Sequence, residues 1–460
     1  MMHSDKDPII AKASAAGQGG IGVVRLSGQA KSLDELTEKL FVGKVLKPRY
    51  ATLLPVIDKD GKLIDRAIVL RFSGPASYTG EDVLEIQAHG GMAVQQMILD
   101  RCLELGKSVG LRMANPGEFS QRAFLNGKMD LAQAEAVADL IEASNNAAAR
   151  AAARSLQGEF SSRVNAINQA ILELRAYIEA TMDFPEEEID FIQNGHVNEK
   201  IEEISQMLEA LCRSAMRGKV LRDGLTVVLV GPPNVGKSSL MNALAGDDVA
   251  IVTDIAGTTR DKITYSINLD GLTINLIDTA GVRMTEDTVE RIGIERTLKA
   301  IEDADVVIHM MSATETDTQV AEQALELIRP RLREGVVFIN VLNKIDLRDG
   351  LDEPSHQGSL RVSAKTREGL ESLIVKLKEL SGINQDAQGD FLARSRHLDC
   401  LARANEHIAV IRSARVGELI GLDIAAEELR LASLALGEIV GQTVADDLLG
   451  MIFSKFCIGK

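Results

Sequence analysis

The chain has 460 residues, too many for one compact core, so roughly two to four domains are expected. A hydrophobic fraction of 45% and a charged fraction of 26% are ordinary for globular protein. The net charge of −16 opposes broad, nonspecific binding of nucleic acid, because an acidic surface repels a phosphate backbone. A local basic patch, or the basic surface of a partner, could still contact an RNA.

The four cysteines lie far apart and form no Cys-x-x-Cys pair, which opposes a zinc site or a disulfide framework and fits a reducing compartment. The N-terminal residues MMHSDKDPIIAKAS lack the basic start and apolar core of a signal peptide. The sequence also lacks a run of about 18 consecutive apolar residues, which a membrane-spanning helix needs. We therefore expect a cytoplasmic protein that does not cross a membrane.

Three textures follow one another along the chain. Residues 1–125 mix β-like runs such as IGVVRLSG, AIVLRFSG and DVLEIQAHG with the helical stretch VQQMILDRCLELG, which predicts an α+β domain. Residues 126–217 carry long helical stretches, AEAVADLIEASNNAAARAAARSLQGEF and SRVNAINQAILELRAYIEATMDF, the second ending at the acidic break Pro185–Asp190. Residues 385–460 are helical again. We predict one discontinuous helical domain, with 218–384 inserted in it.

Residues 218–384 alternate strands and helices. The apolar runs LTVVLVG, TINLIDTAG, DVVIHMM, VVFINVLNKID and LRVSA are continuous, as in strands that are buried on both faces of a parallel sheet. The segment YSINLDGLTINLI predicts a hairpin that turns at Asp270–Gly271. This inserted region is therefore expected to be an α/β domain.

A phosphate loop follows the first of these strands. The segment Gly231-Pro-Pro-Asn-Val-Gly-Lys-Ser238 lies between strand 226–230 and helix 237–245, where backbone N–H groups can turn towards phosphates. Lys237 would neutralise the β- and γ-phosphates, and the Ser238 hydroxyl would bind Mg²⁺.

Three further loops at strand ends complete a guanine-nucleotide site. Asp278-Thr-Ala-Gly281 can reach the metal through water and contact the γ-phosphate. In Asn343-Lys-Ile-Asp346 the Asp carboxylate can accept two hydrogen bonds from guanine, a pattern that adenine cannot supply. Ser363-Ala-Lys365 can support the base. Four such loops in this order predict a GTPase with a Ras-like G domain.

The catalytic groups depart from the usual GTPase pattern. Val282 occupies the position at which Ras-like GTPases carry a water-orienting Gln, and a valine cannot hydrogen-bond to water. No arginine finger is obvious in the G domain, because Arg260 and Arg283 could equally be exposed or structural residues. Asn234 could hold a monovalent cation in place of an arginine finger, or could only brace the loop. The candidates for orienting the water are acidic residues downstream: Glu286, Asp287, Glu290 and Glu295.

The whole chain closely resembles the MnmE (TrmE) family of tRNA-modification GTPases. The segments that carry the resemblance are IGVVRLSG, SYTGEDVLEIQAHGG, NPGEFSQRAFLNGKMDLAQAEAVADLI, DIAGTTRD, DTAGVRMTEDTVERIGIER and the terminal FCIGK. The resemblance implies potassium-dependent dimerisation of the G domain, with K⁺ held by Asn234, Thr253, Ile255 and Thr258. It adds Thr259 to Ser238 at Mg²⁺, and it favours Glu290 as the catalytic, water-orienting residue. The predicted GTP contacts are then Asn234, Val235, Gly236, Lys237, Ser238, Ser239, Thr253, Thr258, Thr259, Asp278, Thr279, Ala280, Gly281, Asn343, Lys344, Asp346, Ser363, Ala364 and Lys365.

The resemblance also implies that the N-terminal domain dimerises and binds 5-formyl- or 5,10-methylene-tetrahydrofolate. The residues that it implies for this site are Arg25, Glu85, Lys128 and Lys460. A carboxylate can read the N–H edge of the pterin, and basic groups can meet the glutamate tail. His89 is interpreted as structural. Cys457 either docks the C-terminal tail or takes part in catalysis as a thiol, whereas the other three cysteines are expected to pack.

The resemblance finally implies the reaction. GTP hydrolysis would drive the addition of an aminomethyl or carboxymethylaminomethyl group to carbon 5 of the wobble uridine of certain tRNAs. The implied partners are a second copy of the chain, the tRNA and the FAD-dependent MnmG (GidA), together forming a hetero-oligomer. Two alternatives stay open: a ribosome-assembly GTPase, although neither flank resembles a basic RNA-reading domain, and a folate-dependent enzyme for which the G domain is only a regulator.

Overall fold

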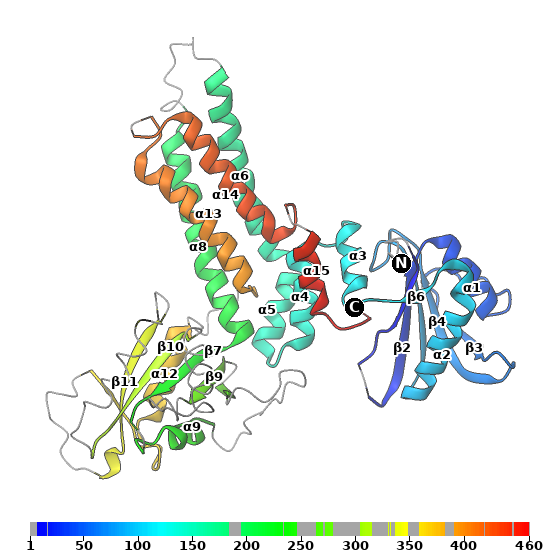
Figure 1. Ribbon diagram of the computed structural model, residues 1–460, viewed down its shortest axis with the longest axis horizontal. Coiled ribbons are helices and arrows are strands. Elements are labelled where there is room, and N and C mark those ends of the chain that lie inside the picture. Colours follow the sequence, from blue (N-terminus) through cyan, green and yellow to red (C-terminus); the bar gives the residue numbers. More distant parts are fainter. Residues whose placement is uncertain are drawn as a thin grey trace, which may run out of the picture. The chain divides into compact units, whose positions relative to one another are not determined.

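Figure 1 shows the computed structural model of the chain. It describes residues 7–15, 17–183, 195–232, 234–245, 264–269, 272–278, 304–314, 330, 332, 336–347, 358–381, 391–417, 419–443 and 446–459. The chain forms two compact units: the first comprises Met1–Glu142, Ala152–Leu211 and Asp399–Lys460, and the second comprises Ala143–Ala151 and Cys212–Leu398. The finer division into three domains at 125, 217 and 384 stays a prediction.

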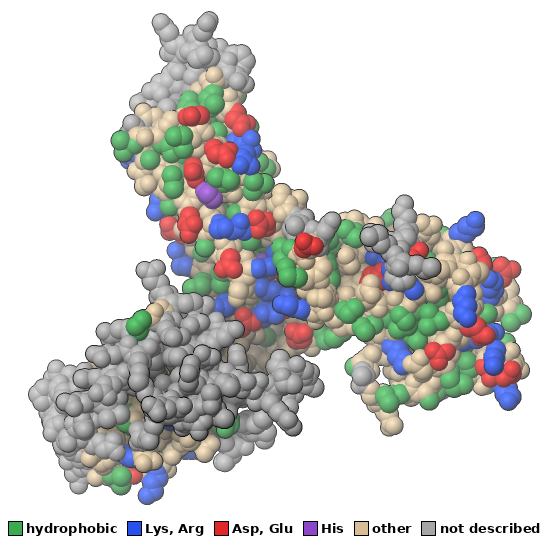
Figure 2. Space-filling model, in the orientation of Figure 1, with side chains coloured by type: hydrophobic (Ala, Val, Ile, Leu, Met, Phe, Trp, Pro, Cys, Tyr) green, Lys and Arg blue, Asp and Glu red, His purple; other side chains and the backbone are tan. Residues whose placement is uncertain are grey.

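The described surface is mixed in charge. On the face shown in Figure 2, Lys and Arg side chains are interspersed with Asp and Glu over the described helices. Among the described residues, no helix combines the length and the apolar character that crossing a membrane requires.

The N-terminal part is an α+β fold, as the sequence predicts. Its six-stranded sheet has the order β3-β4-β5-β2-β1-β6, antiparallel except where β1 meets β6. The strands are β1 (Ile9–Lys12), β2 (Gly19–Gly28), β3 (Thr52–Ile57), β4 (Leu63–Phe72), β5 (Asp82–Gly90) and β6 (Arg112–Met113). The accompanying helices are α1 (Ala30–Leu40), α2 (Met92–Leu105) and the short 3-10 helix η1 (Gly106–Val109).

Alternation along the strands separates two faces of this sheet. Val24, Leu26 and Ile86 are fully buried in one core cluster with Leu33 of α1 and Ile98 of α2. Their sequence neighbours point the other way, because successive side chains in a strand alternate. We call this second side the open face; it is formed by Ile21, Val23 and Arg25 of β2, Ile68 and Leu70 of β4, and Glu85, Gln87 and His89 of β5.

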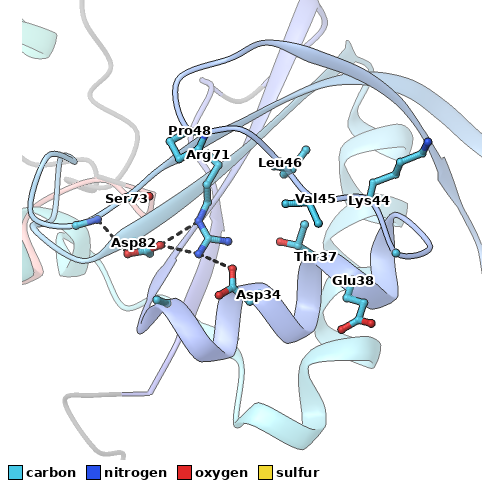
Figure 3. Close-up of a pocket in the computed structure, with 13 residues that line it drawn as sticks. Asp34, Thr37, Glu38, Lys44, Val45, Leu46, Pro48, Arg71, Ser73 and Asp82 are labelled. Carbon is cyan, nitrogen blue, oxygen red and sulfur yellow. Dashed lines mark hydrogen bonds and ion pairs between the residues drawn. The ribbon is translucent and has the colours of Figure 1, made fainter.

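A buried arginine fixes α1 to the sheet on the side opposite the open face. Arg71 of β4 is 6% exposed and donates from Nε and Nη2 to Asp82 of β5, at 3.0 and 2.6 Å. Its Nη2 also lies 2.9 Å from Asp34 of α1. Figure 3 shows these groups at one end of a cavity of about 720 Å³, whose other walls include Val45, Leu46 and Pro48 of the segment after α1.

The helices that follow the N-terminal sheet contain more breaks than the sequence pattern indicates. The stretch from Ala134 to Phe160 is not one helix, because Asn145 accepts the N–H of Ala148 at 2.8 Å and begins a new helix there. The helices are α3 (Glu118–Leu125), α4 (Leu131–Glu142), α5 (Asn146–Leu156), α6 (Glu159–Asp183), α8 (Val197–Asp223), α13 (Ser395–Ala414), α14 (Leu422–Val440) and α15 (Asp446–Ser454). The described part of α6 runs to Asp183, and the predicted break at Pro185–Asp190 lies outside the described residues.

The C-terminal tail returns to the N-terminal sheet. Phe453 and Phe456 are buried and lie with their ring centroids 5.3 Å apart, in a cluster with Leu131 of α4. Beyond them Gly459 has φ of 99°, and a Cβ there would lie 2.1 Å from the carbonyl oxygen of Lys12. The tail therefore needs a glycine at this point of contact with β1.

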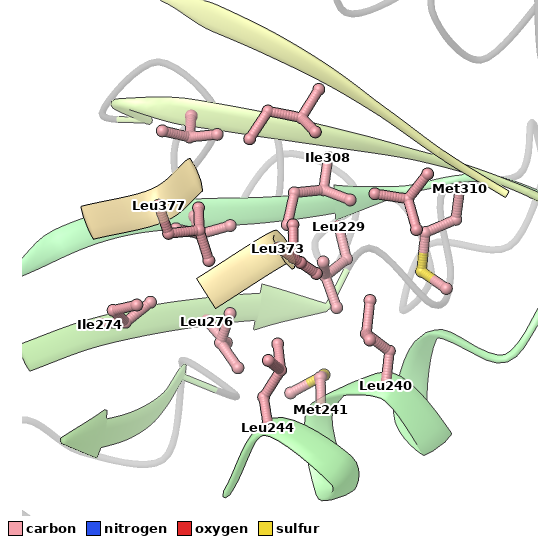
Figure 4. Packing of buried hydrophobic residues seen from close by; sticks show 14 of the residues in the cluster. Leu229, Leu240, Met241, Leu244, Ile274, Leu276, Ile308, Met310, Leu373 and Leu377 are labelled. Atoms are coloured by element: carbon pink, nitrogen blue, oxygen red, sulfur yellow. The ribbon is translucent and has the colours of Figure 1, made fainter. Parts of the chain in front are cut away.

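The second unit contains the inserted α/β domain. Its sheet has the order β12-β11-β10-β7-β9-β8, parallel except for the hairpin of β8 and β9, which is confirmed. The core in Figure 4 joins the sheet to helices α9 and α12 through residues such as Leu229, Leu240 and Leu373. The elements are β7 (Leu225–Val230), α9 (Lys237–Ala245), β8 (Thr264–Leu269), β9 (Leu272–Asp278), β10 (Val306–Ser312), β11 (Val337–Asn343), the 3-10 helix η3 (Ile345–Leu347), β12 (Leu360–Arg361) and α12 (Leu370–Ser381).

Replacing Arg71 tests the link between α1 and the sheet. Arg71→Ala leaves Asp82 as a largely buried carboxylate without its partner, so we expect the free energy of unfolding of the N-terminal part to fall by about 3 kcal/mol. Urea denaturation, followed by hydrogen exchange in β4 and β5, measures this loss. Lys44→Ala changes an exposed side chain of the same cavity and should leave stability unchanged; equal effects of the two substitutions would contradict this role for Arg71.

Candidate functional site

The phosphate loop lies where the order of the parallel strands changes direction. It follows β7, whose neighbours are β9 on one side and β10 on the other, and it leads into α9. Ligands of open α/β sheets bind at such points. Asn234 and Gly236 adopt positive φ values of 63° and 99°, which turn the loop tightly before the helix. The predicted succession of strand, loop and helix is therefore confirmed.

Asn343 joins the phosphate loop to the loop after β12. Its side chain is 1% exposed; Nδ2 donates to the carbonyl oxygen of Val235 at 2.9 Å, and Oδ1 accepts the N–H of Ala364 at 3.0 Å. A Cβ on Gly236 would lie 2.3 Å from Nδ2, so this contact requires glycine. The sequence motif indicates a guanine-reading loop, but it does not reveal that its asparagine connects two other loops.

Asp346 is held in turn by Ser363. The Oγ of Ser363 donates to Asp346 Oδ1 at 2.7 Å and accepts the N–H of Thr366 at 3.1 Å. Ser363 is fully buried, whereas Asp346 is exposed. Because one oxygen is fixed by Ser363, the carboxylate has a defined direction in which to accept hydrogen bonds from a base. Lys344 precedes it with φ of 65°, and Lys365 is exposed.

Lys237 is turned onto its own loop. It is 8% exposed, and Nζ donates to the carbonyl oxygens of Gly231 and Pro232, at 2.8 and 3.0 Å. A phosphate that draws the ammonium group towards itself must compete with these two bonds. Ser238 and Ser239 are exposed in the first turn of α9, where backbone N–H groups favour an anion.

Several predicted site residues lie outside the described residues: Thr253, Ile255, Thr258, Thr259, Thr279, Ala280, Gly281, Glu290 and Lys460. The backbone of Asp278 ends β9, next to the strand that carries the phosphate loop, but its side chain is also outside the description. Among the predicted cation ligands, the structure therefore describes Asn234 and Ser238.

In the first unit, the open face brings Arg25 and Glu85 together. The two residues are directly opposite on β2 and β5, and Arg25 Nε and Nη2 each lie 2.9 Å from Glu85 Oε1. Their side chains are 21% and 16% exposed. Among the described residues, the second oxygen of Glu85 is recorded with a long contact of 3.5 Å to Gln87 Nε2. Arg25 therefore orients Glu85, which leaves Oε2 to accept from a ligand.

Aromatic side chains border this ion pair. The Arg25 guanidinium lies 5.5 Å from the centre of the Tyr78 ring and 5.9 Å from that of Phe119. Burial raises the pKa of Tyr78, whose hydroxyl is hydrogen-bonded to Ser120. Lys128 is exposed, and its stem runs beside Gly80 in the loop that carries Tyr78. Phe119 is fully buried, so it supports the guanidinium from inside the fold, whereas Tyr78 is partly exposed. A directed carboxylate, a guanidinium and the Tyr78 ring fit the polar edge and flat ring of a tetrahydrofolate.

Cys457 is exposed, so it does not dock the tail by packing. Its carbonyl oxygen accepts the N–H of Gly117 at 3.4 Å, and the buried neighbour Phe456 supplies the packing. The tail reaches β1 at Lys12, a residue that pairs with Val24, the neighbour of Arg25. Cys102 and Cys400 are buried as expected, and burial raises the pKa of Cys102 to about 12.

Asn343→Ala tests the connection between the loops. The substitution leaves two buried backbone groups without their hydrogen bonds, so we expect the free energy of unfolding to fall by about 2–4 kcal/mol and GTP affinity to weaken at least about tenfold. Thermal denaturation and fluorescent-nucleotide titration measure these effects. Glu371→Ala, which changes an exposed residue of α12, is the control; an Asn343 variant with unchanged nucleotide affinity would contradict the connection.

Comparisons with known proteins give the family of the chain. The family model described as GTP-binding protein TrmE N-terminus matches residues 8–128, and the MnmE helical domain model matches residues 131–457. A tRNA modification GTPase MnmE of Bordetella petrii is 52% identical over 100% of both chains, and one of Burkholderia ambifaria is 50% identical, also over 100% of both. A solved G domain of the T. maritima FeoB iron transporter is 32% identical, with a TM-score of 0.27, and covers 34% of this chain and 98% of its own. The chain belongs to the tRNA modification GTPase MnmE family.

Proposed function

We propose that the chain hydrolyses GTP to drive the addition of an aminomethyl or carboxymethylaminomethyl group to carbon 5 of the wobble uridine of certain tRNAs. The observation that carries the GTPase part is Asn343, whose side chain binds both the phosphate loop and the base-supporting loop. The tRNA part rests on full-length relatives named for tRNA modification. The carbon comes from 5-formyl- or 5,10-methylene-tetrahydrofolate, and an FAD-dependent partner completes the assembly.

Hydrolysis is activated when two G domains meet with K⁺ between nucleotide and loop. Asn234 supports this proposal, because it is exposed in the phosphate loop and can offer a side-chain oxygen to a cation. Thr253, Ile255 and Thr258 supply the further oxygens, and Thr259 joins Ser238 at Mg²⁺. Glu290 orients the attacking water, since Val282 cannot.

The cation proposal predicts a difference between two salts. GTP turnover should rise at least about tenfold when KCl replaces NaCl at equal ionic strength, because the bound cation stabilises charge that develops on the phosphates. Asn234→Ala should lose this difference while it keeps its affinity for GTP. Steady-state phosphate release measures the rates, and Lys237→Ala provides the inactive control. Equal rates of the parent chain in both salts would exclude the proposal.

The folate site lies on the open face, at Arg25 and Glu85, with Lys128 beside the loop of Tyr78 and Lys460 following the docked Gly459. A bound tetrahydrofolate would supply the one-carbon unit, while Glu85 reads its polar edge. The N-terminal sheet also exposes Leu53 by 56% and Ile68 by 42%, which pair across β3 and β4 and suit contact with a second copy of the chain. Because charges of both signs are mixed on the described face in Figure 2, we assign much of the tRNA-binding charge to the partner.

Glu85→Gln tests the folate site. Losing one charge-assisted hydrogen bond should weaken binding of 5-formyl-tetrahydrofolate by about 10- to 100-fold, and equilibrium dialysis measures this. Glu104→Gln, an exposed glutamate on α2 away from the open face, should bind like the parent chain. Reconstitution with the FAD-dependent partner, GTP, tRNA and methylene-tetrahydrofolate should yield the modified uridine by mass spectrometry; a tRNA that stays unmodified would overturn the proposed function.

A further inference from the structure

His89, at the end of the open face, is hydrogen-bonded to Asp65 of the neighbouring strand β4. The Nδ1 atom of His89 lies 2.9 Å from both carboxylate oxygens of Asp65, and the main-chain N–H of His89 donates to Oδ2 at 2.8 Å. The Asp65 side chain is 12% exposed, whereas the imidazole is 79% exposed. A nearly buried carboxylate thus holds one nitrogen of a ring whose other side faces solvent.

The carboxylate also decides which nitrogen of the ring carries the proton. Burial alone would raise the pKa of Asp65, but the hydrogen bonds from the His89 backbone and ring outweigh it and hold the pKa below its usual value. An ionised carboxylate can only accept, so Nδ1 must be the donor in the neutral ring. The lone pair of Nε2 is then directed away from Asp65, as in a histidine that acts as a base.

This imidazole shares a face with the proposed folate residues. Arg25 pairs with Glu85, Val23 with Gln87, and Ile21 with His89, at every second residue along the two strands and therefore on one face. Since a strand rises about 3.4 Å per residue, His89 lies about 13 Å along β5 from Glu85. A ligand that lies along the strand meets a carboxylate at one end, the apolar Ile21 near the other end, and a basic nitrogen beside it.

A purely structural role explains this geometry less well. The backbone N–H of His89 already ties β5 to Asp65 of β4, so the ring is not needed for that link. The histidines that do serve packing here are covered: His309 is 6% exposed and His397 is 2% exposed. Asp65 fixes the orientation of the imidazole through Nδ1, and most of the ring is exposed to solvent. This arrangement leaves Nε2 able to contact a ligand.

We propose that His89 is the base that deprotonates the amine incorporated into the modified uridine, and that Asp65 positions it. The inference rests on the proposed function, in which a one-carbon unit on the open face meets an amine. A primary amine arrives largely as ammonium. Nε2 accepts one proton from it: the N–H bond of the ammonium breaks, the Nε2–H bond forms, and the nitrogen lone pair becomes free to attack. Asp65 stabilises the resulting imidazolium, which returns the proton to solvent.

The charged groups around His89 suit this step. Asp65 contacts the ring, and Arg66 follows it on β4; the Arg25–Glu85 ion pair lies four residues away along β2 and β5. On β1 and α2, Lys12 donates to Gln96, whose amide donates to Asp100. Among the described residues, Asp65 is therefore the charged side chain bound to the ring.

His89→Asn is the decisive variant, because an asparagine amide can still donate to Asp65 while Nε2 is removed. We expect 5-formyl-tetrahydrofolate to bind to within about threefold of the parent affinity, and GTP turnover to be unchanged. Amine incorporation by the reconstituted assembly should fall by about 10²- to 10⁴-fold at neutral pH. The difference in rate between the variant and the parent chain should become smaller as pH rises, because a larger share of the amine is then already neutral. Added imidazole should restore part of the variant's rate.

Two further variants separate orientation from general effects. Asp65→Asn can donate to Nδ1 and so favours the proton on Nε2; ¹⁵N spectra of the labelled full chain should show this change of tautomer, together with a loss of amine incorporation. His196→Asn is the matched control, since His196 is a 71% exposed histidine beside Glu199 in the helical part. It should behave as the parent chain in every assay.

The outcomes distinguish this inference from the function on which it rests. If the parent chain fails to bind 5-formyl-tetrahydrofolate, the proposed folate site and the inference both fail. If the parent binds folate and modifies tRNA, but His89→Asn does so at the same rate and with the same pH dependence, only the inference is overturned. A variant that loses folate affinity and recovers full activity at saturating folate would show a binding residue, and would also overturn it.

Discussion

The nucleotide site of this chain depends on the two hydrogen bonds of one buried amide. Asn343 ends β11, yet its side chain is used by the phosphate loop before α9 and by the loop after β12. Three loops that each begin at a different strand end are thereby fixed to one another. A buried amide whose oxygen and nitrogen are both hydrogen-bonded destabilises the fold little, whereas an unpaired one lowers the free energy of unfolding by about 1–3 kcal/mol. The fold therefore favours the one loop arrangement that provides both partners. Gly236 is part of the same constraint, because any side chain there would meet the amide.

The N-terminal sheet applies a different constraint to the open face. Its register places Glu85, Gln87 and His89 of β5 on one side and Leu84, Ile86 and Ala88 on the other, under α1 and α2. A shift of one residue would bury Glu85 and His89 and expose Leu84 and Ile86. The core therefore fixes the position of the polar groups, although it makes no contact with a ligand. This link between packing and site explains why burial alternates along β5 from Leu84 to His89.

Local sequence patterns are sufficient to predict most helices and strands and the order of the G-domain loops. Alternation predicts β2, β4 and β5, and the succession of strand, glycine loop and lysine predicts the start of α9 where the structure has it. The sequence pattern does not reveal the helix break at Asn145, because the alanines around it favour helix on both sides of the capping residue. The identities of the GTP and folate contacts stay predictions. Residue motifs name these groups, but they do not reveal which of them bind one another, as Asn343 binds Val235 and Arg25 binds Glu85.

The contact between His89 and Asp65 could not be predicted from the sequence either. In the sequence His89 precedes two glycines at the end of a strand, which favours a structural interpretation. Its partner Asp65 is 24 residues away on another strand, so no local pattern connects them. Only the pairing of β4 with β5 brings the carboxylate to the ring, and only the open face leaves the ring exposed. Arg25 and Asp65 thus act alike. Arg25 binds one oxygen of Glu85, and Asp65 binds one nitrogen of His89, so each of these two partners has a second atom in a fixed direction. Glu85 keeps an acceptor for N–H groups, while His89 keeps a base, and a face that carries both can hold a ligand and receive a proton from it.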